Sequence, residues 1–310
     1  MLSLGLTGGI AAGKSLLSAR FRDLGALVID ADQLAREVVA PDSPGLRAVV
    51  EHFGAGMLLA DGALNRPALG AMVFSDKAQL AALNAITHPL VREAATALKS
   101  SAGPGTIVVQ DIPLLVETGQ GPAFHLVVVA QAPLESRLRR MMTDRGMSYE
   151  DAMARIGAQA SDEQRMSAAD VVIVNDGTRE DALGAVDALW FDRLVPFAVN
   201  LAAGIAATAS PDASTVHAAA ASVPLEEGAR DRLLARLHVA VGASAEIVPS
   251  CSAHGPVFVI EAARGTSRGS LLAALAAAGY FPLPQGGGST LLASADPGQH
   301  ATIELAAAPL

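Results

Sequence analysis

One stretch of this chain decides its fold: Gly8-Gly9-Ile10-Ala11-Ala12-Gly13-Lys14-Ser15. It fits the phosphate-loop pattern G-x-x-x-x-G-K-[S/T] at every fixed position. An apolar run precedes it, which predicts a buried strand, and the residues from Leu16 onward can begin a helix. A tight loop between a strand and a helix points its backbone N–H groups at a phosphate chain, and the positive end of the helix adds to the attraction.

Two side chains of this loop suggest how a nucleotide is held. Lys14 can reach the β- and γ-phosphates of ATP or GTP, and the hydroxyl of Ser15 can hold Mg²⁺. The alternative is a glycine-rich turn with a chance lysine, which the flanking strand and helix disfavour. The loop predicts nucleotide binding but does not identify the group that receives the phosphoryl.

The composition limits which kinds of protein this chain can be. The 310 residues leave room for two domains, and the net charge of −9 disfavours general nucleic-acid binding, which needs Lys and Arg against phosphates. Cys251 is the only cysteine, which excludes an intrachain disulfide and suits a reducing cytoplasm. No apolar run reaches about 18 residues, so we expect no membrane-spanning helix and a cytoplasmic protein.

The first 195 residues alternate strand-like and helical stretches, which is typical of an α/β protein with a parallel sheet. We expect a P-loop NTPase-type sheet of five strands flanked by helices. The expected strands are 2–6, 26–29, 105–110, 125–130 and 170–174. A helical insertion at about 40–100 is a natural acceptor site, and an arginine-rich helical segment at about 134–168, here called the lid, can close over phosphates.

The character of the chain changes after the first domain, which we place at 1–198. Residues 199–225 are rich in Ala, Ser and Thr and are expected to be a linker. A smaller α+β domain is expected at 226–310. Its predicted elements are helices at 226–241 and 268–278 and strands at 257–260 and 301–305.

Acidic residues follow two of the expected strands, where an open α/β sheet binds its ligands. Asp32 is placed to accept a proton from an attacking hydroxyl, or to orient it; the alternative is the N-cap of the next helix. Asp30 could contact Mg²⁺ through water. Asp111 could belong to the Mg²⁺ shell, or could end its strand in a solvated turn. His88, alone, is more typical of a structural hydrogen bond.

The lid arginines also allow two interpretations. Arg140 and Arg145 could bind phosphate with two hydrogen bonds each. They could equally lie on a solvated helix face paired with Asp and Glu, and spacing does not distinguish these.

Together, a series of short motifs in this order resembles the dephospho-coenzyme A kinase family over about residues 2–195. The matching motifs are Gly5-Leu6-Thr7-Gly8-Gly9-Ile10 with Gly13-Lys14-Ser15, Ile29-Asp30-Ala31-Asp32, Leu64-Asn65-Arg66, Val73-Phe74, His88-Pro89, Asp111-Ile112-Pro113-Leu114-Leu115 with Glu117, Arg155-Ile156 with Gln159, and Ala169-Asp170-Val171-Val172-Ile173 with Asn175.

The resemblance implies transfer of the γ-phosphoryl of ATP, with Mg²⁺, to the ribose 3′-hydroxyl of dephospho-coenzyme A. It implies Asp32 as the base, Lys14 and Ser15 on the phosphates and Mg²⁺, and Arg140 as the lid arginine at the phosphates, with Arg137 and Arg145 as rivals. The implied nucleotide side also includes Gly8, Gly9, Ile10, Ala11, Ala12, Gly13, Leu16 and, toward the base, Asn175. The implied acceptor side comprises Asp32, Arg66, His88 and Asp111.

Three residues depart from the family pattern. Ala11 and Ala12 replace a Gly and a small residue inside the loop, and Leu16 stands where a Thr commonly follows the serine. An alanine would be strained wherever the loop requires a positive φ. Lys14 and Ser15 are kept, so we expect activity to survive.

The C-terminal segment loosely resembles a degenerate GrpB-like domain, through 229–242 and 271–280. That family's middle motif is replaced here by Ser250-Cys251-Ser252-Ala253-His254-Gly255. We interpret this stretch as a loop of small residues without a catalytic role, in preference to a site with Cys251 as a thiol nucleophile. We expect a structural or interaction role for this domain.

Two other functions stay open. A nucleoside or nucleotide kinase on the same scaffold would need a different acceptor pocket within 40–100. A nucleotide-binding regulatory module is the alternative from another class, and the presence of Lys14 and Asp32 argues against it.

Overall fold

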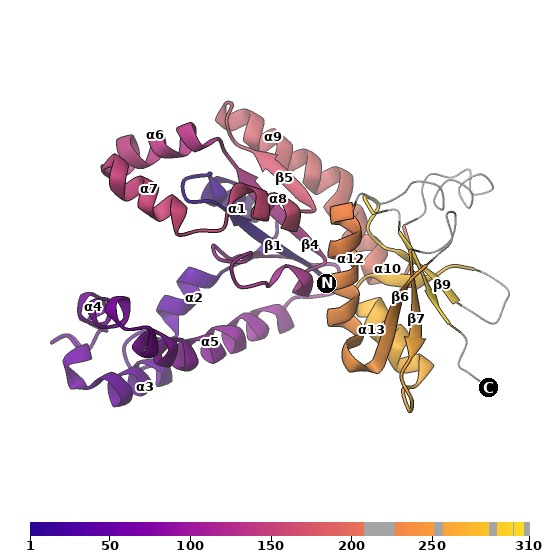
Figure 1. Ribbon diagram of the computed structural model, residues 1–310, viewed down its shortest axis with the longest axis horizontal. Helices are drawn as coiled ribbons and strands as arrows, with labels where there is room; N and C mark the ends of the chain where they lie inside the picture. The colour runs from indigo at the N-terminus through magenta and orange to yellow at the C-terminus, as the bar shows by residue number, and fades with distance from the viewer. Residues whose placement is uncertain (208–226, 251–256, 285–289, 300, 307–310) are drawn as a thin grey trace. The chain divides into compact units, whose positions relative to one another are not determined.

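The computed structural model describes residues 1–207, 227–250, 257–284, 290–299 and 301–306 (Figure 1). The chain divides into two compact units. The smaller unit comprises residues 28–103 and 110–112, and the larger unit comprises the rest. The expected linker at 199–225 and the stretch at 251–255 fall mostly or wholly outside the described residues, so the domain boundaries stay predictions.

The N-terminal part is built on the five-stranded parallel sheet that the sequence predicts. Its strands are β1 (Leu2–Gly8), β2 (Leu27–Asp30), β3 (Ile107–Asp111), β4 (Leu126–Gln131) and β5 (Val171–Val174), in the order β2-β3-β1-β4-β5. In the centre, Leu4 of β1 pairs with Leu126 of β4, in parallel. Every residue of β1 is buried, as expected for a central strand covered on both faces.

Helices of the larger unit connect and cover these strands (Figure 1). They are α1 (Lys14–Asp23), α6 (Leu134–Arg145), α7 (Tyr149–Gly157), α8 (Asp162–Ala168), α9 (Arg179–Leu189), a π-helical turn (Trp190–Leu194) and α10 (Val195–Ala203). Serine or threonine side chains cap three of these helices: Ser148 caps α7, Ser161 with Gln164 forms a capping box on α8, and Thr178 caps α9. The predicted lid is therefore three short helices joined by turns.

The smaller unit holds the predicted helical insertion. Its helices are α2 (Ala31–Glu37), α3 (Pro44–Phe53), α4 (Arg66–Ser75) and α5 (Lys77–Ser100), with a short 3₁₀ turn at Ala55–Met57. They enclose a core of their own, formed by Val39, Leu46, Val49, Met57, Leu64 and Leu69. Side chains of Ser43, Asn65 and Asp76 cap α3, α4 and α5.

The C-terminal segment forms a second, smaller sheet. Its strands are β6 (Ala245–Pro249), β7 (Phe258–Ala262), β8 (Tyr280–Pro282), β9 (Thr290–Ser294) and β10 (Thr302–Leu305), in the order β6-β7-β10-β9-β8. Helices α12 (Glu227–Val241) and α13 (Arg268–Ala277) pack on it through Leu233, Leu237, Leu271 and Leu275. The predicted helices and two predicted strands are confirmed, whereas β6, β8 and β9 were not predicted.

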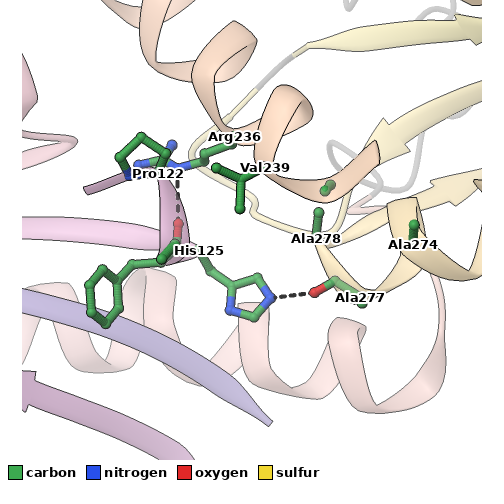
Figure 2. Close-up of a pocket in the computed structure, with 10 residues that line it drawn as sticks. Pro122, His125, Arg236, Val239, Ala274, Ala277 and Ala278 are labelled. Atoms are coloured by element: carbon green, nitrogen blue, oxygen red, sulfur yellow. Dashed lines mark hydrogen bonds between the residues drawn. The ribbon is translucent and has the colours of Figure 1, made fainter. Parts of the chain in front are cut away.

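Helix α12 joins the C-terminal segment to the first sheet through a buried carboxylate. Asp170, directly before β5, accepts hydrogen bonds from Arg232 Nε at 3.2 Å and from both terminal nitrogens of Arg236. Arg236 Nε also donates to the carbonyl of Phe124 at 3.0 Å (Figure 2). All three charged side chains are largely buried, so this contact is a structural junction and not a surface ion pair.

A half-buried histidine makes a second junction, on α13. His125 Nδ1 accepts a hydrogen bond of 3.0 Å from the backbone N–H of Ser3, so Nε2 is the protonated nitrogen and donates to the carbonyl of Ala277 at 2.9 Å (Figure 2). Ser3, Phe124, His125 and Asp170 all lie at or before the starts of β1, β4 and β5. The C-terminal segment therefore meets the first sheet at the amino ends of its strands. No helix in the described ranges is both long and apolar enough to cross a membrane.

Candidate functional site

The phosphate loop connects the carboxyl end of β1 to the first turn of α1. Gly13 caps α1 in a left-handed conformation, with φ of 93°, and Ala11 is also left-handed, with φ of 61°. The strain expected for an alanine inside this loop is thus present at Ala11. An L-residue in this region costs of order 1 kcal/mol or more, so the surroundings must hold the loop in place.

Three side chains hold the loop by donating hydrogen bonds to its carbonyl oxygens. Arg137 Nε donates to Ile10 at 2.9 Å, and Arg140 Nη1 donates to Ala11 at 3.1 Å. Asn175 Nδ2 donates to the carbonyl of Ala12 at 3.0 Å, within a fully buried contact.

The sequence left the choice among the lid arginines open, and the structure places both Arg137 and Arg140 against the loop backbone. Arg140 also donates to the carbonyl of Asn175 at 2.8 Å. Arg139, Arg145 and Arg155, by contrast, have exposed side chains. Asn175 lies beside Gly13, where a Cβ would approach its amide nitrogen to 1.8 Å, so glycine is the residue that fits position 13.

Arg137 belongs to a charge network in which the two arginines are buried and the carboxylate is partly exposed. Its Nη1 pairs with Asp162 at 3.1 Å, and Arg165 pairs with the same carboxylate. Burial lowers the pKa of Arg137. Burial alone would raise the pKa of Asp162, but hydrogen bonds from Arg165 and Gln131 and the charge of Arg137 outweigh it, and the pKa lies below its usual value. Sequence spacing gave no signal for this network.

Lys14 and Ser15 open α1 directly after the loop. Lys14 is half-buried and Ser15 is exposed. The first N–H groups of a helix have no partner inside the helix, and they carry its positive end. The loop, Lys14 and the start of α1 thus form one site suited to a phosphate chain.

The remaining predicted residues belong to the smaller unit. Asp32 is exposed in the first turn of α2, and Asp30, not Asp32, is the N-cap, with its carboxylate accepting from Gln33 N at 2.9 Å. Arg66 at the start of α4 and His88 within α5 are exposed, whereas Asp111 is buried at the end of β3. Among described residues, no group of three or more His, Cys, Asp or Glu is arranged to hold a metal.

A model of the dephospho-CoA kinase family matches residues 2–181, more than half of the chain. The chain belongs to the dephospho-CoA kinase family. Its relatives include the dephospho-CoA kinase of Mycolicibacterium paratuberculosis, with 51% identity over 201 residues that cover 65% of this chain and 49% of the relative. The dephospho-CoA kinase of Streptomyces avermitilis is 50% identical over 192 residues, which cover 62% of this chain and 94% of that one.

The chain spans about half the length of several of these curated relatives. Among solved structures, a crystal structure of a Thermus thermophilus protein matches with a TM-score of 0.55 and 34% identity, over 62% of this chain and 97% of that one. The residues that the family model matches, 2–181, include all five strands of the first sheet.

Proposed function

We propose that this chain transfers the γ-phosphoryl group of ATP to the 3′-hydroxyl of the ribose of dephospho-coenzyme A, giving coenzyme A and ADP. The observation that carries the proposal is the phosphate loop, with its backbone held by Arg137, Arg140 and Asn175, in a chain of the dephospho-CoA kinase family. The acceptor is inferred from the names of the relatives.

In this proposal the loop and Lys14 bind the phosphates, and Asp32 takes the proton from the 3′-hydroxyl. The oxygen then attacks the γ-phosphorus, and the bond to the oxygen that bridges the β- and γ-phosphates breaks, which releases ADP. Such a transfer needs mainly positioning and stabilisation of charge. An exposed carboxylate at Asp32 is compatible with a base that must reach an incoming substrate.

Other residues have supporting roles in the proposal. Arg140 is held beside the loop by its hydrogen bonds to the carbonyls of Ala11 and Asn175, which places its guanidinium next to the proposed phosphate site. Arg66, His88 and Asp111 form the acceptor side, together with Asp32.

The hydroxyl of Ser15 would hold Mg²⁺. This ion retains several waters and takes further ligands from substrate phosphates, so a single exposed hydroxyl oxygen at the start of α1 fits its preferences. When bound, Mg²⁺ would neutralise charge on the phosphates. We also place the reaction in the cytoplasm, as the single cysteine of the chain suggests.

The test is an ADP-release assay with Mg-ATP and four acceptor conditions: dephospho-coenzyme A, adenosine, AMP and none. Turnover with dephospho-coenzyme A alone, with coenzyme A confirmed by mass, supports the proposal. Preferential turnover of adenosine or AMP would replace it with a nucleoside or nucleotide kinase. Nucleotide binding without turnover of any acceptor would favour a regulatory module.

Asp32→Asn tests the proposed base. Turnover should fall by orders of magnitude while ATP affinity, measured by calorimetry, stays close to that of the wild type, because the carboxylate acts on the acceptor. Asp61→Asn is the matched control, since Asp61 is another exposed carboxylate of the smaller unit. Near-normal turnover in Asp32→Asn would remove this residue from the mechanism.

A further inference from the structure

Gln159 contacts the phosphate loop in a way that differs from the other three side chains. It lies between α7 and α8, and its amide oxygen accepts a hydrogen bond of 2.7 Å from the backbone N–H of Ile10. Arg137, Arg140 and Asn175 each bind a loop carbonyl, whereas Gln159 binds a loop N–H. The lid therefore holds Ile10 at both of its backbone polar groups.

Because the peptide bond is planar and trans, this contact determines how the Gly9–Ile10 peptide is oriented. In such a peptide the N–H and the C=O point in opposite directions. With Gln159 on the N–H of Ile10, the carbonyl of Gly9 points the other way, and it accepts from the N–H of Ala12 at 3.0 Å. Gln159 thus fixes the peptide from which the turn Gly9–Ala12 is built.

The next peptide along the loop is held in the reverse sense. Arg137 binds the carbonyl of Ile10, so the N–H of Ala11 points away from the guanidinium. Asn175 binds the carbonyl of Ala12, and the N–H of Gly13 points away from it in the same manner. The N–H groups of Ala11 and Gly13 therefore each point away from the side chain that binds the carbonyl of the same peptide, and a phosphate can accept from them there.

Hydrogen bonds hold the backbone at Gln159 and at its neighbour Ala160, and the N–H of Gln159 donates to the carbonyl of Ile156 at 3.2 Å. The N–H of Ala160 donates to Glu117 at 2.8 Å, and the carbonyl of Ala160 accepts from Arg165 at 2.5 Å. Asp162, two residues further on, pairs with Arg137. The backbone at Gln159 therefore has little freedom left to lose when the side chain binds Ile10, which favours a well-defined contact.

We propose that Gln159 is a positioning residue: it fixes the Gly9–Ile10 peptide, supports the strained backbone at Ala11, and so presents the following N–H groups to the phosphates of ATP. The proposal rests on the proposed function for its nucleotide. A neutral amide oxygen suits this place, because it accepts the hydrogen bond without adding negative charge beside an anion site.

Gln159→Met tests the contact without reference to catalysis. Methionine has a similar length and lacks a strong acceptor. The amide of Ile10, followed by hydrogen exchange in ¹⁵N-isoleucine-labelled protein, should lose protection by about tenfold, the loss expected for one hydrogen bond. Gln120→Met is the matched control, since Gln120 is exposed and bonds only its neighbour Thr118 through its side chain. Unchanged protection of Ile10 in Gln159→Met would overturn the proposal.

The same variant tests the link to the nucleotide. The KM for ATP should rise about tenfold in Gln159→Met, with the KM for the acceptor unchanged, because only the presentation of loop N–H groups is lost. Equal rises in both KM values would indicate a general disturbance of the fold and would contradict positioning. Direct ATP binding by calorimetry gives the same comparison if the wild type phosphorylates no acceptor, so the two proposals fail separately.

Gln159→Glu provides the conservative variant. Its carboxylate still accepts from Ile10 N–H, so the exchange protection should be kept. Its negative charge should raise the KM for ATP at neutral pH, and the ratio of this KM to that of the wild type should shrink as salt screens the charge. A ratio that does not respond to salt, or that stays at one, would place Gln159 away from the phosphates.

Discussion

At the scale of single residues, Ala11 is the point where the sequence and the backbone disagree. It adopts a φ of 61° inside the phosphate loop, a conformation that suits glycine. We predict that Ala11→Gly stabilises the protein by about 0.5 kcal/mol, because relief of the Cβ strain exceeds the entropy that glycine gains in the unfolded chain. Urea denaturation measures this change.

The control for that substitution is an alanine for which glycine should change the stability in the opposite direction. Ala19 is exposed within α1, so Ala19→Gly should destabilise the protein by about 1 kcal/mol. Equal destabilisation by both changes would mean that Ala11 carries no strain.

Gly13 combines a positive φ with a close neighbour, and the two effects can be separated. Gly13→Ala would place a Cβ 1.8 Å from the amide nitrogen of Asn175, at a φ of 93°. Gly25 has a φ of 103° and no heavy atom within 4 Å of a built Cβ. We predict that Gly13→Ala abolishes measurable ATP binding, whereas Gly25→Ala leaves it intact and costs only about 1 kcal/mol of stability. Similar ATP affinities in the two variants would exclude the contact as the cause.

At the scale of elements, α12 contributes two arginines to a carboxylate at the start of β5. Asp170→Asn removes the buried negative charge that Arg232 and Arg236 both bind and should lower the free energy of unfolding by about 3 kcal/mol. Asp187→Asn is the matched control, because its pair with Arg20 is about one-third exposed. A much smaller effect is expected there. Equal effects would show that burial of the Asp170 pair is unimportant.

Elements also show what the sequence could predict. The five strands of the first sheet were predicted within two residues because continuous apolar, β-branched runs between helical stretches are typical of buried parallel strands. Strands β6 and β8 carry weaker signals. Strand β6 has five residues and is half exposed, and β8 has only three residues. Both strands end in a proline. Such short segments do not differ from loops in composition.

The site shows the same contrast. The phosphate loop could be predicted from the local sequence. By contrast, only the structure could show that Asp30, and not Asp32, caps α2. The contact between Gln159 and Ile10 joins residues 149 positions apart, so no local pattern reveals it. The roles assigned to Asp32, Arg66, His88 and Asp111 stay predictions.

At the scale of the whole molecule, His125 makes stability depend on pH. Burial lowers its pKa, the bond to Ala277 opposes this, and the positive charges of the N-terminus and Arg236 add to the lowering. Below about pH 6.5, His125 binds a proton in the unfolded chain but stays neutral in the folded protein until a lower pH is reached. The free energy of unfolding therefore falls as the pH falls through this range.

We predict a loss of up to about 1.4 kcal/mol per pH unit below pH 6.5, measured by urea denaturation between pH 7.5 and 5.5. His125→Asn keeps an acceptor for Ser3 N–H and cannot titrate, so its stability should vary less over this range. The depressed pKa of Asp162 acts below about pH 4 and does not interfere. Equal slopes for the two proteins would assign the pH dependence to other groups.

The two ends of β1 have a practical consequence. Near its start, Ser3 binds His125, which in turn binds Ala277 of the C-terminal segment. Its last residue, Gly8, begins the phosphate loop, six residues or roughly 20 Å beyond Leu2 along the strand. Attachment of the protein to a sensor surface through α13 or β10 should leave the loop open to solution. Surface-based kinetic measurements of nucleotide arrival and departure are therefore feasible on this chain without blocking the site under study.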